Sequence, residues 1–148
     1  MLLDGKAVAQ AIRQALAQQV KAHTNQGGRA PHLAIILLGH DPASHTYVHN
    51  KIKAYHEAGF EATLIQQEDM AEAALLRLVR QINENEAIDG LIVQLPLPQH
   101  ISTPKVINCI KPAKDVDGLH TLNYGRMARN LPAHIPATPL GILTLLEL

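Results

Sequence analysis

Apolar residues follow two different spacings along this chain. Over residues 4–25 they recur at about every fourth position, which predicts an amphipathic helix with Asp4 as its cap and Gly27 at its end. Residues 33–38 are instead six apolar residues in a row, closed by a glycine. Such an unbroken run is typical of a strand that is buried on both faces.

The rest of the chain alternates in the same way. Further strands are predicted over residues 60–66 and 90–95, and further helices over 41–58, 70–85, 103–110 and from 139 onward, with a loop-rich stretch over 111–135. Strands that alternate with helices predict an α/β fold, in which a mainly parallel sheet lies between helices in three α/β/α layers. The last helix is rich in Leu and Ile, and these side chains need cover.

Ligands of such sheets bind outside the carboxyl ends of the strands. Three segments are expected there, namely 39–44, 94–101 and 111–125. We therefore look for the chemistry of the protein in these loops.

Composition narrows the class of protein. The chain has 148 residues, which fits one domain, and its 13 basic residues balance its 13 acidic ones. Without a basic excess, the sequence favours neither a nucleic-acid nor a membrane partner. Its one cysteine, Cys109, lies in an apolar run and is expected to be a buried structural thiol. The absence of a disulfide framework, of a secretory signal and of long apolar stretches predicts a soluble cytoplasmic protein.

One helix carries a candidate catalytic face. Ser44, Tyr47 and Lys51 are spaced i, i+3 and i+7, so they share one side of the helix that follows the first buried strand. A protonated lysine there could bind an anion, and a desolvated one could exchange protons near neutral pH. The alternative is a solvated helical face with a tyrosine packed at its edge.

Two loops offer further polar groups. Gln94 follows four apolar strand residues, and the prolines after it stiffen a loop that could present its amide. A proline-rich surface connection would have the same pattern. Residues 114–118 carry Asp115 and Asp117, which could form a simple turn, or supply a carboxylate for an amidine-like nitrogen edge. A calcium loop is not expected, because the other oxygen ligands are missing.

Metal and phosphate sites of the common kinds are not expected. Nine histidines are present, and His45 and His49 are spaced i, i+4. They lack the glutamate of the zinc-protease motif and any cysteine pair, so we interpret them as solvated helix residues. No glycine-rich phosphate loop is present either.

Taken together, the motifs resemble one family along essentially the whole chain. They are an Ala-Ser followed by Tyr-Val and two spaced lysines over residues 43–53, Asp-Gly-Leu-Ile-Val-Gln-Leu-Pro-Leu-Pro over 89–98, Lys-Asp-Val-Asp-Gly over 114–118, Asn-Tyr-Gly-Arg over 123–126 and Thr-Pro-Leu-Gly-Ile over 138–142. The chain resembles the N-terminal catalytic domain of the bifunctional methylenetetrahydrofolate dehydrogenase/methenyltetrahydrofolate cyclohydrolases. The resemblance implies a domain of the amino-acid dehydrogenase-like type.

The resemblance also implies roles for particular residues. Lys51 would be the central catalytic residue and Gln94 its contact, while Tyr47 would stack on the folate ring and also belong to the catalytic set. Asp117 would bind the nitrogen-rich edge of the pterin. The remaining substrate-binding positions are Ser44, Leu95 and Pro96. One departure is Ala137, which stands where the family usually has a cysteine before Thr-Pro.

For the whole enzyme, the resemblance implies NADP-dependent oxidation of 5,10-methylenetetrahydrofolate and hydrolysis of the product to 10-formyltetrahydrofolate. These reactions belong to one-carbon metabolism, which serves purine and amino-acid biosynthesis. NADP would be held by a C-terminal Rossmann domain that lies beyond residue 148, in an enzyme that is a homodimer, whereas residues 1–148 alone could be a monomer. Two alternatives stay open, namely a non-catalytic folate-binding fragment and the substrate domain of another two-domain dehydrogenase.

Overall fold

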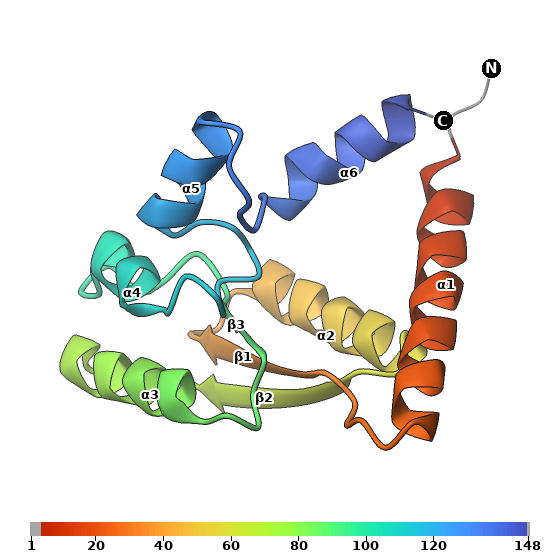
Figure 1. Cartoon of the computed structure of the whole chain (residues 1–148). Helices are drawn as coiled ribbons and strands as arrows, with labels where there is room; N and C mark the ends of the chain where they lie inside the picture. Colours follow the sequence, from red (N-terminus) through yellow and green to blue (C-terminus); the bar gives the residue numbers. More distant parts are fainter. Residues whose placement is uncertain (1–3, 148) are drawn as a thin grey trace.

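The computed structural model describes residues 4–147. Helices and strands alternate along it, in the order α1 (Gly5–Asn25), β1 (His32–Leu38), α2 (Pro42–Glu57), β2 (Glu61–Gln67), α3 (Glu72–Glu84), β3 (Gly90–Val93), α4 (Thr103–Cys109), α5 (Thr121–Ala128) and α6 (Ala137–Leu146). The three strands are parallel and lie in the order β2-β1-β3. Helices cover both faces of this sheet (Figure 1), so the predicted α/β/α architecture is confirmed.

The central position of β1 explains its unbroken apolar run. Ile35 pairs with Leu64 of β2 on one side and with Ile92 of β3 on the other. Successive side chains of a strand point to opposite faces. Because both faces are covered, all of Leu33–Leu38 is buried.

Two apolar cores lie on opposite faces of the sheet. On one face, α3 and α4 contribute side chains such as Leu75 and Val106, which pack with Ile36 of β1. On the other face, Val48 of α2 packs with Ile35. The first helix, α1, packs against α2 (Figure 1) and has no buried residue, so it forms an outer layer.

The ends of α1 follow the sequence closely. Asp4 Oδ1 accepts hydrogen bonds from the backbone N–H groups of Lys6 and Ala7, at 3.1 and 3.0 Å. These bonds satisfy donors that have no partner inside the helix. After the helix, Gly27 has a φ of +89°, a conformation that favours glycine. The predicted cap and end of the helix are both confirmed.

Two details differ from the sequence-based predictions. The stretch 111–135, expected to be loops, contains the eight-residue helix α5. Its cap is the imidazole of His120, whose Nδ1 accepts from the Leu122 N–H at 2.9 Å, and histidine is not among the usual capping residues. Cys109 is only partly buried, although it packs against the larger core as expected of a structural thiol.

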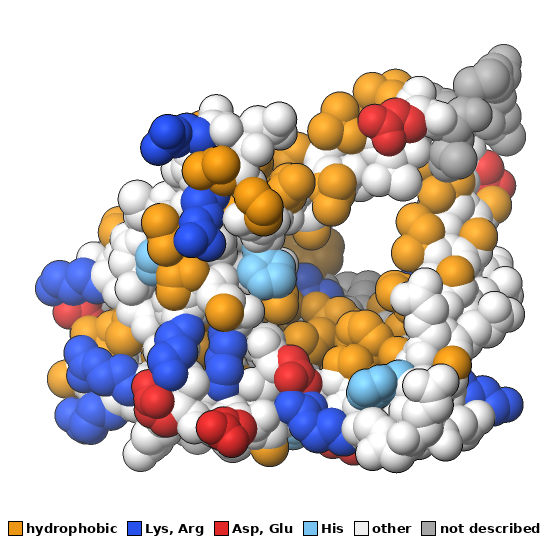
Figure 2. All heavy atoms as spheres, viewed as in Figure 1, with side chains coloured by type: hydrophobic (Ala, Val, Ile, Leu, Met, Phe, Trp, Pro, Cys, Tyr) orange, Lys and Arg blue, Asp and Glu red, His pale blue; other side chains and the backbone are white. Residues whose placement is uncertain are grey.

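The last helix, α6, has no buried residue, and most of its apolar side chains are exposed within residues 4–147. With α1 it lines an apolar groove of about 450 Å³. Figure 2 shows apolar side chains along both of these helices. None of the helices in the described part of the chain is both long enough and apolar enough to cross a membrane.

Candidate functional site

The first turn of α2 is capped by Asp41 and joined to the loop after β3. Asp41 caps the helix, and its Oδ2 accepts bonds from the Ser44 hydroxyl at 2.6 Å and from the Ser44 N–H at 2.7 Å. These bonds hold the pKa of Asp41 below its ordinary value, and the bond from the hydroxyl contributes most. Ser44 Oγ also lies 3.4 Å from the carbonyl oxygen of Leu95. Ser44 is only 3% exposed, so it joins α2 to the loop after β3 rather than facing a ligand directly.

Lys51 of α2 contacts Gln94, the residue that directly follows β3. The ammonium Nζ of Lys51 donates to Gln94 Oε1 at 3.1 Å, and Gln94 Nε2 donates to the Leu95 carbonyl at 2.8 Å. The Gln94 backbone N–H also bonds to the Ile36 carbonyl at 2.9 Å, which ties the residue to β1. No carboxylate of residues 4–147 forms an ion pair with Lys51. The lysine is therefore held by a neutral amide and keeps two donors for a ligand.

An open hollow of about 460 Å³ surrounds this contact. Its walls are formed by Tyr47, Asn50, Lys51, Ala54 and Gln94. The Tyr47 side chain is 61% exposed, so the face of its ring is free to stack on a flat ligand. The sequence predicted that Tyr47, Lys51 and Gln94 would come together, and the structure brings them together.

Asp117 shares the electrostatic environment of Lys51. Burial raises the pKa of Asp117, an effect that the positive charge of Lys51 opposes and the charge of Asp115 reinforces. Burial likewise raises the pKa of Tyr55 to about 12, and Asp117 contributes to that shift. Asp117 is thus coupled electrostatically to Lys51 and to Tyr55, two residues of α2.

Sequence reasoning missed Asn50 and Ala54, which line this hollow, and Tyr55, which packs against the core beneath α2 and is coupled to Asp117. They lie three or four positions from Tyr47 or Lys51, so the helical spacing that singled out the catalytic face could also have included them. In the loop after β3, Leu95 is half-buried and Pro96 exposed, and the peptide bond between them is cis. Neither residue lines the hollow.

Most of the chain is similar in sequence to one known protein family. Residues 3–117 match the family model described as tetrahydrofolate dehydrogenase/cyclohydrolase, catalytic domain. The chain belongs to this family. The resemblance noted in the sequence is therefore confirmed.

The relatives of this chain are longer proteins. The bifunctional protein FolD of Amoebophilus asiaticus is 60% identical over 99% of this chain and 50% of its own length. A 5,10-methylenetetrahydrofolate dehydrogenase from the silkworm, Bombyx mori, has 41% identity and a TM-score of 0.95, over 99% of this chain and 51% of that one. The Trypanosoma brucei dehydrogenase-cyclohydrolase, solved with NADP cofactor and inhibitor, has 36% identity and a TM-score of 0.93, with 99% and 51% coverage. This chain spans about half the length of the relatives it matches.

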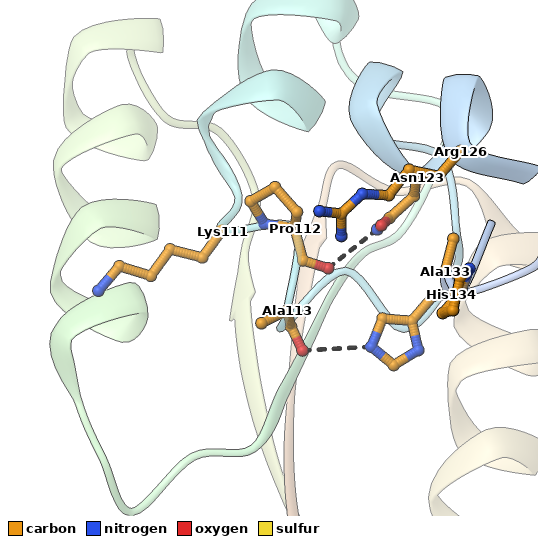
Figure 3. A pocket seen from close by; sticks show the side chains of 8 residues that line it. Lys111, Pro112, Ala113, Asn123, Arg126, Ala133 and His134 are labelled. Atoms are coloured by element: carbon orange, nitrogen blue, oxygen red, sulfur yellow. Dashed lines mark hydrogen bonds between the residues drawn. The ribbon is translucent and has the colours of Figure 1, made fainter.

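A larger hollow, of about 580 Å³, lies between α5 and the loops beside it (Figure 3). There Asn123 Nδ2 donates to the Pro112 carbonyl at 2.9 Å, and His134 Nε2 lies 3.2 Å from the Ala113 carbonyl. Arg126 is a further lining residue, and it has no ion pair among residues 4–147. None of the site residues predicted for this family member lines the hollow. The bonds of Asn123 and His134 to these backbone carbonyls serve the loop structure.

The histidines and the turn between β1 and α2 bear on metal and nucleotide binding. Within residues 4–147, no group of three His, Cys, Asp or Glu side chains could hold a metal ion. His45 and His49 bond to the backbone carbonyls of Gly39 and His45, both at 3.2 Å. The turn from β1 to α2 contains one glycine, Gly39, so it lacks the glycine-rich loop that cradles a dinucleotide phosphate.

Proposed function

We propose that this chain is the folate-binding, catalytic domain of a bifunctional methylenetetrahydrofolate dehydrogenase/methenyltetrahydrofolate cyclohydrolase. The observation that carries the proposal is the contact between Lys51 and Gln94 beside the exposed ring of Tyr47. A lysine with an amide partner, an aromatic surface and a nearby carboxylate is a suitable set for a flat, nitrogen-rich substrate. Membership of the family supports the choice of tetrahydrofolate derivatives as that substrate.

In this proposal, two side chains orient the substrate. Tyr47 stacks on the folate ring system, since its ring is exposed over the hollow. Asp117 accepts hydrogen bonds from the nitrogen-rich edge of the pterin, for which a planar carboxylate is a good partner. Ser44, Leu95 and Pro96 contribute by shaping the loop after β3, because the Ser44 hydroxyl lies beside the Leu95 carbonyl. Such positioning lowers the entropy cost of reaching the transition state.

Lys51 would move protons during hydrolysis. Water forms a C–O bond with the methenyl carbon, and one proton leaves the attacking oxygen. The bond from that carbon to N5 then breaks, and the hydroxyl proton passes to N5, which gives 10-formyltetrahydrofolate. A folate ring over α2 would exclude water from the lysine, and a desolvated lysine exchanges protons near neutral pH. Gln94 would hold its Nζ toward the substrate carbon.

The dehydrogenase step needs NADP as hydride acceptor. The strand-to-helix turns of residues 4–147 offer no glycine-rich phosphate loop, so we propose that a separate C-terminal Rossmann domain holds the dinucleotide. Relatives of twice this length, one of them solved with NADP, support that arrangement. A homodimer of the whole protein, working in cytoplasmic one-carbon metabolism, belongs to the same proposal and rests on the family alone.

Calorimetric titration of residues 1–148 with a tetrahydrofolate analogue, beside assays of methenyltetrahydrofolate hydrolysis and NADP reduction, tests this function. We expect folate binding, and no NADP reduction with methylenetetrahydrofolate. Binding without hydrolysis would reduce the chain to a folate-binding module. NADP reduction by residues 1–148 would contradict the assignment of the nucleotide to a separate domain.

A further inference from the structure

A buried carboxylate without a cation organises the turn that carries Asp117. Asp115 is 1% exposed and forms no ion pair among residues 4–147. Its oxygens accept three neutral donors, namely the Leu119 N–H at 3.2 Å, the His120 N–H at 2.8 Å and Asn123 Nδ2 at 2.8 Å. A buried carboxylate is stable only when its oxygens are satisfied, so each of these donors matters.

Asn123 is the one side chain among these donors. It is 2% exposed, lies in α5, and donates from the same Nδ2 to Asp115 Oδ2 and to the Pro112 carbonyl at 2.9 Å. Figure 3 shows the second of these bonds. A single amide therefore links α5 to both ends of the segment 112–115.

Two backbone contacts fix the rest of the turn. Before it, the Leu91 N–H of β3 bonds to the Lys114 carbonyl at 2.8 Å. After it, Gly118 has a φ of +67°, and a Cβ there would lie 2.7 Å from the backbone of Ile135 and Pro136. Asp117 thus lies between two fixed residues, Lys114 and Gly118. Asn123 holds the carboxylate of Asp115, which lies between the same two residues.

We propose that Asn123 is a positioning residue for Asp117, because its double hydrogen bond fixes the 115–118 turn and thereby holds the backbone that carries the Asp117 carboxylate. The inference rests on the proposed function, in which Asp117 binds the nitrogen-rich edge of the folate ring. A carboxylate that pairs with such an edge must meet its donors within hydrogen-bond distance. A shift of the turn by about 1 Å would lose that geometry.

The test compares two buried asparagines. Asn123→Leu removes the donor. Asn83→Leu is the matched control, since Asn83 is 7% exposed and also makes two hydrogen bonds, both with the backbone: its Nδ2 donates to the Cys109 carbonyl at 2.7 Å, and its Oδ1 accepts from the Lys111 N–H at 2.9 Å. Both variants lose stability. Only Asn123 bonds directly to the carboxylate of the turn.

The first readout needs no ligand. NMR titration of the Asp117 carboxyl in residues 1–148 should show its raised pKa falling toward the ordinary value in Asn123→Leu and keeping its native value in Asn83→Leu. An unchanged pKa of Asp117 in folded Asn123→Leu would overturn the inference. Asn123→Ser, which is smaller and has a hydroxyl in place of the amide, gives the same comparison if the leucine variant does not fold.

The second readout is a double-mutant cycle on the affinity for a tetrahydrofolate analogue. Asn123→Leu should weaken binding by about tenfold or more, the size of a lost hydrogen bond to a charged group. This loss should vanish in the Asp117→Asn background, because Asn123 acts through Asp117. Equal losses in both backgrounds would overturn the inference. Failure of the native chain to bind would contradict the proposed function instead, and the Asp117 titration would still decide the inference.

Discussion

Lys51 Nζ lies 3.1 Å from Gln94 Oε1, although the two residues are 43 positions apart in the chain. The contact joins the middle of α2 to the residue that follows β3, so it exists only when the sheet is formed. It places the proposed proton-transfer group beside the stackable ring of Tyr47.

Lys51→Met should lower the rate of methenyltetrahydrofolate hydrolysis by about 100-fold or more, the usual contribution of a general acid or base. Methionine keeps the apolar length of the side chain but cannot carry a proton. The measurement is the steady-state rate of methenyltetrahydrofolate hydrolysis, made in whichever form of the protein, residues 1–148 or a longer chain, catalyses this reaction. Lys53→Met is the control, since Lys53 is exposed on the same helix, and it should retain native turnover. Near-native hydrolysis by Lys51→Met would refute the role of this lysine.

Gln94→Leu should reduce hydrolysis by about tenfold to 100-fold, because a hydrogen bond to a charged group contributes roughly 1.5–3 kcal/mol. Folding should be little affected, since the backbone bond from the Gln94 N–H to the Ile36 carbonyl remains. The kcat of the variant measures the effect. Gln99→Leu, at an exposed position of the same loop, should leave it unchanged. An equal loss in both variants would point to loop damage rather than to the Lys51 contact.

The sequence predicted this part of the site well. Helical spacing put Tyr47 and Lys51 on one face, and the buried strand before Gln94 put its amide at the carboxyl edge of the sheet. Both inferences depend on local periodicity and on a general property of parallel sheets. Neither inference by itself pairs Lys51 with Gln94, because that bond depends on how α2 crosses the sheet; only the family resemblance implied the contact.

Asp117→Asn should make the chain more stable at neutral pH. Burial raises the pKa of Asp117, so the folded chain holds this proton more tightly than the unfolded chain. The associated stability is present below the ordinary pKa of 3.8 and is lost as pH rises through the folded value. Chemical denaturation between about pH 3 and about pH 7 measures the free energy of unfolding. It should be similar for the two chains at the acid end, and the variant should become the more stable of the two as the pH rises.

The same variant should bind a tetrahydrofolate analogue about tenfold to 100-fold more weakly, since it loses a charged hydrogen-bond acceptor. Asp69→Asn, at an exposed surface position, should change neither property. A variant that gains no stability at pH 7, or that binds as tightly as the native chain, would contradict the description of Asp117 as a buried binding carboxylate.

Gly118→Ala should destabilise the chain by about 3 kcal/mol, because it combines a left-handed backbone conformation with overpacking. The added Cβ would meet the backbone of Ile135 and Pro136 at 2.7 Å, and backbone atoms cannot move aside as a flexible side chain can. Thermal or urea unfolding measures the change.

Gly125→Ala provides the comparison, since a Cβ at this helical position meets nothing within 4 Å. It should be neutral, or stabilise α5 by up to about 1 kcal/mol. If the two alanine variants were equally stable, the close packing of the 115–118 turn against residues 134–136 would be wrong.

The periodic pattern of the sequence did not predict helix α5 or the bonds that hold the 115–118 turn. The bond from Asn123 to Asp115 joins a helix to a loop, and the cap of α5 is a histidine, so neither leaves a periodic signal. Lys114-Asp115-Val116-Asp117-Gly118 could be read as a turn or as a carboxylate site. The structure shows the turn, which Asp115 holds through its hydrogen bonds, while the carboxylate site at Asp117 stays a prediction.

Calorimetric titration of native, Tyr47→Ala and Tyr124→Ala chains with a tetrahydrofolate analogue tests the central claim most directly. The two tyrosines are 61% and 52% exposed, so they are matched in accessibility but lie on different helices, α2 and α5. We predict that Tyr47→Ala weakens binding by about tenfold or more, as loss of a stacking ring does, and that Tyr124→Ala binds like the native chain. Equal affinity of native and Tyr47→Ala chains would contradict a folate site at Lys51 and Gln94.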